Sequence, residues 1–291
     1  MSQAVDVFGL GQCAYDRILV VPRALGPDEK VEGEGLVEQC GGPAATALYA
    51  LSIWGRRCAF SGVVGDDDAG SAMRTDLEQV GVDTSRMIVR EGQRSQQAFI
   101  AVERDTGKRQ ILWQRPTGAP PRDLTVPDMR VFLTDGLFVD EAVRIARDAP
   151  LVVVDAGTLR EGTQAMLSEA DVFVASASFG RALTDDDDPI AACRKIAEHG
   201  ASVAGITLGS EGYVALIDGH IVRRPAYAVR AVDTTGCGDV FHAGLVEGLL
   251  RGWTPADALE LGAWAAAQVA TRLGARAGLP RELEAFPGAR P

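Results

Sequence analysis

The sequence predicts an α/β protein in which helices cover both faces of a mostly parallel sheet. Short apolar runs, of the length and composition of buried strands, alternate with longer segments that carry apolar residues at helical spacing. Several of the longer segments are followed at once by glycine, which commonly ends a helix in the left-handed conformation. This alternation is typical of sheets built from βαβ units.

The expected elements follow one another along the chain. Strands are expected at residues 5–10, 59–64, 131–133, 151–155, 172–175 and 203–208. Helices are expected at residues 44–54, 69–80, 141–149 and 190–199, and Gly55, Gly81 and Gly200 would cap three of them. Thr254 and Pro255 are the residue types preferred where a further helix begins.

Two segments, residues 18–37 and 97–115, depart from this alternation. The second reads as two strands around the turn 105–108, which has the sequence Asp-Thr-Gly-Lys. We interpret the two segments as a discontinuous β-lid, from about residues 13–40 and 95–117, on a single domain spanning residues 1–291. Residues 116–127 contain four prolines and are typical of a linker.

The composition excludes several classes of protein. The 291-residue chain carries 40 Asp and Glu residues against 29 Lys and Arg residues, and its net charge of −11 argues against a general nucleic-acid binder. Five cysteines without a CxxC pair and three scattered histidines indicate neither a disulfide framework nor a structural zinc site. No apolar stretch approaches the ~18–20 residues that span a bilayer, so we expect no membrane partner and a cytoplasmic location.

The most informative chemistry lies at residues 233–239, where the sequence Asp-Thr-Thr-Gly-Cys-Gly-Asp opens an apolar helical pattern. Backbone N–H groups at such a turn, together with the helix dipole, form a site for an anion such as phosphate. Asp239, in the first helical turn, would be well placed to take a proton from a hydroxyl that attacks this phosphate. The simpler alternative is an Asp that only caps a helix after a glycine turn.

This turn resembles the C-terminal signature of the PfkB, or ribokinase-like, carbohydrate kinases, whose usual form is Asp-Thr-Xaa-Gly-Ala-Gly-Asp. Residues 41–46, 54–55 and 62–70 resemble a second signature of the family. Residues 207–212 resemble its nucleotide-binding turn, and the resemblance continues through residues 274–280. The resemblance implies a three-layer α/β/α sandwich with a small β-lid. It also implies ATP-dependent transfer of a phosphoryl group to a sugar hydroxyl, and residues 41–46, 95–99 and 271–280 look most like the branch containing ketohexokinases and sulfofructose kinases.

The resemblance further implies a role for each matching residue. Asp239 would be the catalytic base, and the amides of Gly236, Cys237 and Gly238 would stabilise the transferring phosphoryl group. The residues implied for the sugar are Asp16, Gly41, Gly42 and Thr46. Lys30, Gln97 and Gln114 lie in the lid segments and are further candidates for the sugar, although exposed Lys and Gln side chains on a β-layer are more often only solvated. The residues implied for ATP are Thr207, Gly209 and Gly212. The adenine is expected against the helix that begins at Pro255, where the small residues Ala263, Ala266 and Ala270 leave room for a flat ring, and close helix packing is an equal alternative for them. Asp233 and Thr235 match positions that hold a monovalent cation such as K⁺ in many relatives, although in isolation they are ordinary turn and cap residues.

Three positions depart from the family pattern or leave the interpretation open. Thr46 stands where an Asn is frequent, so an amide that could grip a sugar hydroxyl is lost. Relatives carry Asn-Xaa-Xaa-Glu where this chain has Ser-Ala-Ser-Phe at residues 176–179. We therefore expect Mg²⁺ to be held mainly by nucleotide phosphates and water. We interpret the acidic run 185–188 as a solvated loop and helix cap. For His242, a hydrogen-bonding role on the helix and a substrate contact both stay open.

Two other functions are compatible with parts of the sequence. Residues 9–14 form a Gly-x-Gly-x-x-Ala pattern after the first strand, as in enzymes that bind NAD, but a helix should then follow. A sugar- or nucleotide-binding sensor without turnover would account for the missing Asn-Xaa-Xaa-Glu. A homodimer through the lid is also expected, because exposed strand edges need covering.

Overall fold

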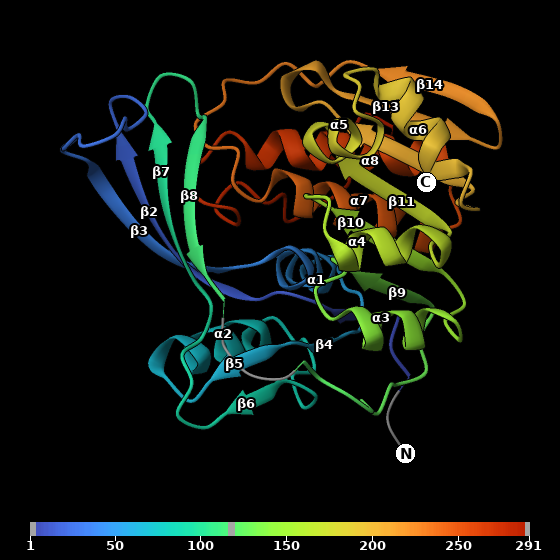
Figure 1. Ribbon diagram of the computed structural model, residues 1–291, viewed down its shortest axis with the longest axis horizontal. Helices are drawn as coiled ribbons and strands as arrows, with labels where there is room; N and C mark the ends of the chain where they lie inside the picture. The colour runs from blue at the N-terminus through green and yellow to red at the C-terminus, as the bar shows by residue number, and fades with distance from the viewer. Residues whose placement is uncertain (1–3, 116–119, 289–291) are drawn as a thin grey trace.

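An eight-stranded sheet forms the centre of the computed structural model, which describes residues 4–115 and 120–288 (Figure 1). The strand order is β14–β13–β12–β11–β10–β9–β1–β4. The strands are β1 (Val7–Leu10), β4 (Cys58–Ser61), β9 (Val131–Thr134), β10 (Val152–Ala156), β11 (Val172–Ser176), β12 (Val203–Thr207), β13 (Tyr213–Ile217) and β14 (His220–Arg224). The six strands from β12 to β4 are parallel, and β13 and β14 continue the sheet as an antiparallel hairpin.

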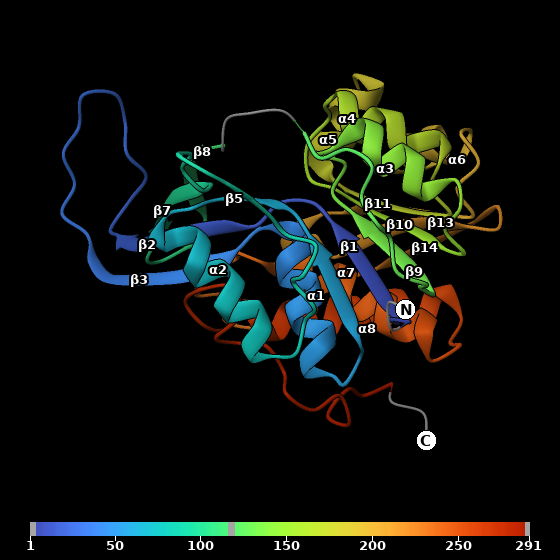
Figure 2. The ribbon, with the colours of Figure 1, turned by 90° about the horizontal axis from the view of Figure 1, so that it is seen from below.

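Helices cover both faces of this sheet, as Figure 2 shows. On one face lie α3 (Val139–Ala146), α4 (Glu161–Ala165), α5 (Ala177–Thr184) and α6 (Pro189–Ala197). On the other lie α1 (Pro43–Ile53), α2 (Asp68–Gln79), α7 (Cys237–Leu250) and α8 (Pro255–Val269). The predicted three-layer α/β/α sandwich with a mostly parallel sheet is therefore confirmed.

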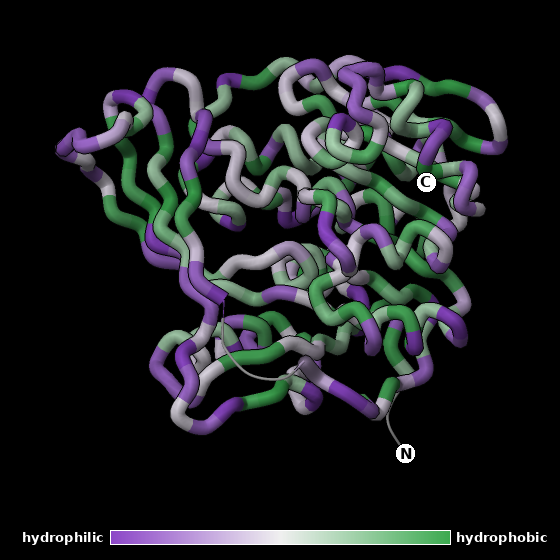
Figure 3. Tube along the Cα trace, viewed as in Figure 1, coloured by the Kyte–Doolittle hydropathy of each residue, from purple (hydrophilic) through white to green (hydrophobic). Residues whose placement is uncertain are grey.

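The core lies between the sheet and each helical layer. Successive side chains of a strand point to opposite faces, so Val7 packs toward α1 and α7 while Phe8 packs toward α3. Phe8 stacks on Phe132 of the neighbouring strand at 6.1 Å between ring centroids. Since both faces are covered, the central strands are hydrophobic along their whole length, which is visible as green stretches in Figure 3.

A second, four-stranded sheet stands beside the main body and forms the lid (Figure 1). Its order is β3 (Glu34–Gly41), β2 (Ala14–Val21), β7 (Gln97–Glu103) and β8 (Arg109–Gln114). Ile18, Ile100 and Val102 form a small apolar cluster on one face of the lid. Because side chains alternate along a strand, Asp16 lies on this same face of β2, which we call the inner face.

The boundaries of the predicted elements differ from the observed ones mainly around glycine. The strand expected at 59–64 is wrong as a single element: it is divided into β4 and β5 (Val63–Gly65), and β5 pairs with β6 (Ile88–Arg90) in a separate two-stranded sheet. A Cβ at Gly62 would lie 2.7 Å from the Phe60 ring and 2.8 Å from the Gly11 carbonyl oxygen, so the chain can bend there only at glycine. The expected glycine caps are confirmed by positive φ at Gly55, Gly81 and Gly200.

Other expectations met different outcomes. The hairpin of β13 and β14 and the helix α5 were not anticipated from the sequence. The linker expected at 116–127 and the end of the lid at 117 lie partly outside the described residues. Within residues 4–115 and 120–288, none of the helices has the length and apolar character required to cross a membrane.

Candidate active site

The glycine-rich turn leads directly into α7. Gly236 is the N-cap of this helix with φ of +78°, a conformation in which other residues are strained, and a Cβ there would overlap Ala275. Gly238 has open space where a Cβ would be, and it is exposed. The first turn of α7 therefore leaves the Gly238 amide open to an approaching anion, whereas the Cys237 amide donates to the Thr234 carbonyl oxygen at 3.3 Å.

Asp233 anchors this turn from the inside. Its Oδ1 accepts hydrogen bonds from the Thr235 amide at 2.8 Å and the Thr235 hydroxyl at 2.7 Å. Its Oδ2 accepts from the Gly274 amide at 2.8 Å, in the segment after α8. The carboxylate thus ties residues 233–239, which we call the catalytic turn after the role expected for them, to the C-terminal segment, and it brings together the two residues expected at a cation site.

Asp239 faces an unusual concentration of negative charge. Burial raises the pKa of Asp239 to about 8, and the carboxylates of Asp155, Asp16 and Asp135 raise it further, while Arg109 opposes them. Asp155 lies in β10 and Asp135 directly follows β9, so both stand at the carboxyl ends of parallel strands. This edge of an open α/β sheet is where such folds place their ligand sites.

The lid touches the catalytic turn through its β7–β8 hairpin. Arg109 donates a hydrogen bond to the Thr234 hydroxyl, and this hydroxyl donates to the Gly107 carbonyl oxygen at 3.2 Å. The lid therefore brings one cation within electrostatic range of Asp239.

Asp16, Gly41, Gly42 and Thr46 form a second part of the site, between the lid and α1. Burial raises the pKa of Asp16 to about 7. A Cβ at Gly41 would overlap Asp16 Oδ2, and Gly42, the N-cap of α1 with φ of +96°, would place a Cβ 2.5 Å from the Gln12 carbonyl oxygen. The Thr46 side chain is fully buried, and its hydroxyl has no hydrogen-bond partner among residues 4–115 and 120–288.

Asp135 stands behind this part of the site in a buried polar network. It accepts hydrogen bonds from the amides of Gln12 at 2.7 Å and Leu137 at 2.9 Å, and Arg160 lies 3.7 Å away. Burial raises the pKa of Asp135, and Arg160 partly offsets this.

The residues expected to bind ATP lie in two places. Thr207 ends β12 beside Ser176 of β11, and Gly209 and Gly212 have φ of +60° and +95° in the turn that follows, so this turn borders the carboxyl edge of the sheet. On α8, Ala263 and Ala266 are half-buried and pack against the main core, whereas Ala270 is buried and its carbonyl accepts from the Val232 amide at 2.7 Å. Ala270 therefore holds the start of the catalytic turn through its backbone carbonyl.

Two residues expected at the sugar, Gln97 and Gln114, are not brought to Asp16. In the register of the lid, Gln97 and Gln114 pair with each other and with Tyr15, so they lie on the opposite face from Asp16. Gln97 instead accepts a hydrogen bond from Arg17 at 2.6 Å. Sequence periodicity alone could have assigned these positions to the outer face.

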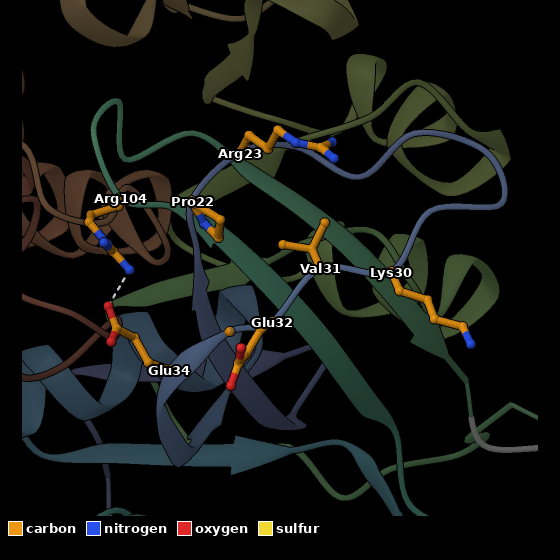
Figure 4. A pocket seen from close by; sticks show the side chains of 8 residues that line it. Pro22, Arg23, Lys30, Val31, Glu32, Glu34 and Arg104 are labelled. Carbon is orange, nitrogen blue, oxygen red and sulfur yellow. Dashed lines mark hydrogen bonds and ion pairs between the residues drawn. The ribbon is translucent and has the colours of Figure 1, made fainter.

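Lys30 lies in the long loop between β2 and β3. It borders a hollow of about 490 Å³ at the tip of the lid (Figure 4). Figure 4 shows its ammonium group directed away from the ion pair of Glu34 and Arg104. Among the described residues, no hydrogen bond or ion pair joins Lys30 to the catalytic turn.

The region that departs from the family pattern is occupied by helix caps. Ser176 caps α5 by accepting from the Phe179 amide at 3.1 Å, and it also donates to the Gly157 carbonyl oxygen at 2.8 Å. Asp188 caps α6 by accepting from the Ile190 amide at 2.9 Å, with Pro189 at the first helical position. The interpretation of the acidic run as a loop and helix cap is confirmed.

Sequence reasoning missed Asp135, Asp155, Arg109 and Arg160. A usable signal existed for the two acids, since each follows a short buried run that is a parallel strand. Neither arginine had such a signal, because each reaches the site only through tertiary packing. The Gly-x-Gly-x-x-Ala pattern is followed by strand β2 rather than by the helix that an NAD-binding unit requires.

The fold and this site together define a class of α/β enzymes that transfer phosphoryl groups, and comparison with known proteins identifies the family. Residues 5–282 match the family described as pfkB family carbohydrate kinase. The chain is 25% identical to the ribokinase of Haemophilus influenzae, over 94% of this chain and 95% of that protein. It is 31% identical to an uncharacterized sugar kinase of Archaeoglobus fulgidus, over 80% of this chain and 99% of that protein.

A solved structure agrees with the fold. The Arabidopsis thaliana ribokinase, solved with ribose and ATP, superposes with a TM-score of 0.80 at 19% identity, covering 96% of each chain. The chain belongs to the pfkB family of carbohydrate kinases. It is therefore an ATP-dependent phosphotransferase with an alcohol group of a sugar as acceptor.

Proposed function

We propose that Asp239 is the general base of this kinase and acts on a sugar hydroxyl held between the lid and α1. The observation that carries the proposal is the position of Asp239, which lies three residues after Gly236 in the first turn of α7 with its pKa raised to about 8. A base with a pKa near the operating pH combines adequate ionisation with adequate proton affinity.

The proton and the phosphoryl group would move in one step. Ionised Asp239 takes the proton from the sugar hydroxyl, whose oxygen bonds to the γ-phosphorus as the bond to the ADP oxygen breaks. The amides of Gly236, Cys237 and Gly238 and the dipole of α7 face the charge that develops on the γ-phosphate oxygens. These donors are held in advance by the Asp233 anchor, so little reorganisation accompanies the reaction.

The acceptor would be positioned by Asp16 and Thr46. Asp16, when ionised, accepts from sugar hydroxyls, and the absence of side chains at Gly41 and Gly42 leaves room beside it. The unpartnered hydroxyl of Thr46 supports this proposal, because a buried hydroxyl without a partner is costly until a ligand supplies one. Gln97, Gln114 and Lys30 have no part in this version of the site. Ketohexoses and sulfosugars are the first substrates to test, because the sequence signatures are most similar to that branch.

ATP would lie across the carboxyl edge of the sheet, along the turn of Thr207, Gly209 and Gly212 and toward α8. Mg²⁺, when bound, neutralises charge on the phosphates. Within the described part of the chain, no group of three or more His, Cys, Asp and Glu side chains is placed to hold a metal. We therefore assign its ligands mainly to phosphate and water.

A monovalent cation such as K⁺ fits the residues at the catalytic turn. From the described residues, Asp233 Oδ2 accepts one hydrogen bond and retains an acceptor position, and the Thr235 hydroxyl oxygen keeps its lone pairs while donating to Asp233. The cation would stiffen the turn that carries the amides. Replacing K⁺ with tetramethylammonium should lower turnover; unchanged turnover would remove this assignment.

The experiment that tests the proposal is ATP consumption with Mg²⁺ and K⁺ over a panel of ketohexoses, aldopentoses, sugar acids, sulfosugars and nucleosides. Asp239→Asn is the active-site variant, and Asp140→Asn, an exposed carboxylate in the first turn of α3, is the matched control. We expect turnover on one substrate class that falls at least ~10²-fold in Asp239→Asn and stays in Asp140→Asn. Equal turnover in both variants would contradict the role of Asp239.

We also propose that two copies of the chain pair through the outer face of the lid. Phe99 and Leu112 face each other across β7 and β8 on this face and are 53% and 71% exposed. Exposed apolar side chains on a small open sheet are typical of an interface. Light scattering should show a dimer that Leu112→Asp converts to a monomer; a monomeric wild-type protein would refute the proposal.

A further inference from the structure

His242 is a buried side chain that the proposed reaction leaves without a role. It lies on α7, one turn after Gly238, and only 3% of its surface is exposed. Its Nδ1 is 2.8 Å from the Gly238 carbonyl oxygen, and its Nε2 is 3.1 Å from the Val174 carbonyl oxygen. Both ring nitrogens therefore face acceptors.

Neither neutral form of the ring satisfies this environment. Neutral imidazole carries a proton on one nitrogen and a lone pair on the other. Whichever nitrogen lacks the proton would point its lone pair at a carbonyl oxygen within hydrogen-bond distance. Only the imidazolium form, with two N–H groups, donates to both carbonyl oxygens.

A carboxylate completes the arrangement. Asp155 Oδ2 lies 3.3 Å from His242 Nδ1. This oxygen is buried and has no hydrogen-bond partner in the part of the chain that the structure describes, so the imidazole is its close polar neighbour. Asp155 is paired in register with Val174 across β10 and β11, which is why one ring from α7 can reach both the carboxylate and the carbonyl.

The pair stands next to the proposed base. Among the charged groups that act on Asp239, Asp155 has the largest effect; Asp16 and Asp135 act in the same direction, and the Arg109 guanidinium acts in the opposite direction. A cation held against Asp155 would cancel the nearest of these negative charges. The same ring holds the carbonyl of Gly238, which belongs to the anion-binding turn.

We propose that His242 is a positioning residue, held as an imidazolium against Asp155, that balances the charge around Asp239 and fixes the first turn of α7. This inference rests on the proposed role of Asp239 as base. It extends that role, because it assigns to a buried ion pair behind the base the task of offsetting the negative charge that opposes ionisation of the base.

The charge of His242 can be read without any enzymatic assay. In ¹⁵N NMR spectra of the full chain, the exposed His199 and His220 serve as internal references, and the signal missing from His242→Asn identifies His242. We expect two protonated ring nitrogens for His242 at neutral pH, where an exposed histidine is mostly neutral. One unprotonated ring nitrogen at neutral pH would overturn the proposal, whatever the activity of the enzyme.

The kinetic test follows the pH profile of kcat/KM. Its acidic limb is the range in which kcat/KM falls at low pH as Asp239 becomes protonated, and we expect this limb to shift in opposite directions in two variants. His242→Asn keeps a donor but removes the cation, so the uncompensated Asp155 charge should move the limb to higher pH by about one unit, a tenfold loss below the limb. Asp155→Asn removes the carboxylate and should move the limb to lower pH. The double variant should return toward the wild-type position.

A purely structural role predicts something different. It would lower kcat/KM by the same factor at every pH and leave the limb where it is in His242→Asn, and that result would overturn the proposal. If His242→Asn does not fold, the shift in Asp155→Asn still decides, and the NMR signal of His242 is assigned as the one that remains in both His199→Asn and His220→Asn. Full turnover in Asp239→Asn would instead refute the proposed base while leaving the NMR result intact.

Discussion

The substitution Asp239→Asn should raise the stability of the protein while it abolishes turnover. In the folded chain the pKa of Asp239 is about 8, against an ordinary value of 3.8, because the group is buried beside Asp155. The folded state therefore holds a proton that the unfolded chain releases. Between the two values, the free energy of unfolding of the wild type falls as pH rises, and above about pH 8 both states are ionised and the loss is complete.

The size of the effect follows from the difference between the pKa of Asp239 in the folded chain and its ordinary value. About four units correspond to a ceiling of about 6 kcal/mol at high pH, since each unit is worth ~1.4 kcal/mol. The pKa of about 8 already includes the opposing charge of Arg109, and the partial solvent exposure of Asp239 brings the expected gain down to about 2 kcal/mol. For a chain of this length, that gain raises the melting temperature by about 4 °C.

The assay is thermal unfolding followed by circular dichroism at a series of pH values from the ordinary carboxylate range to above 8. The gain in Asp239→Asn should grow with pH and then level off. Asp140→Asn, whose carboxylate is exposed, should show no such trend. A gain that is absent, or that does not change with pH, would refute the argument from burial.

Three further substitutions test separate parts of the site. Thr46→Val removes the unpartnered hydroxyl at constant shape, so the KM for the sugar should rise about tenfold while the KM for ATP stays constant; equal changes in both would contradict a sugar contact. Gly42→Ala should lower the free energy of unfolding by about 2–4 kcal/mol in urea titrations, because φ is positive and the Cβ meets the Gln12 carbonyl. Gly55→Ala, with positive φ but open space, should lower it by only about 1 kcal/mol. Arg109→Met removes the cation that lowers the pKa of Asp239, so the acidic limb of kcat/KM should move to higher pH, and an unmoved limb would exclude this electrostatic role.

Much of the fold could be predicted from the sequence because its signals are local. The parallel strands are short apolar runs, the helices carry N-cap residues such as Thr254, and glycines with positive φ end several of them. The division at Gly62 could not be foreseen, because it depends in part on the approach of the Gly11 carbonyl oxygen from another part of the fold. In the missed hairpin, β13 is a largely buried apolar run that the sequence analysis left unused, whereas β14 is almost entirely exposed and gives no such signal.

The candidate site was predictable where a compact motif carries it. The turn from Asp233 to Asp239 is continuous in sequence, and the structure keeps it together through one carboxylate. Asp155 and Arg109 belong to separate strands, so only the sheet topology and the lid show that they face Asp239. Gln97 was expected near the sugar from its place in the lid segment alone. The register puts it on the outer face, because one step along a strand separates an inner residue from an outer one.

The central claim is that Asp239 removes the proton of the acceptor hydroxyl, and single-turnover kinetics test it most directly. Wild type and Asp239→Asn are each loaded with sugar and MgATP, with binding of both ligands checked by calorimetry, and the phosphorylated sugar is quantified over time. We predict that Asp239→Asn binds both ligands within a few-fold of the wild type and forms product at least ~10²-fold more slowly. Product formed at the wild-type rate by the fully loaded variant would contradict the account.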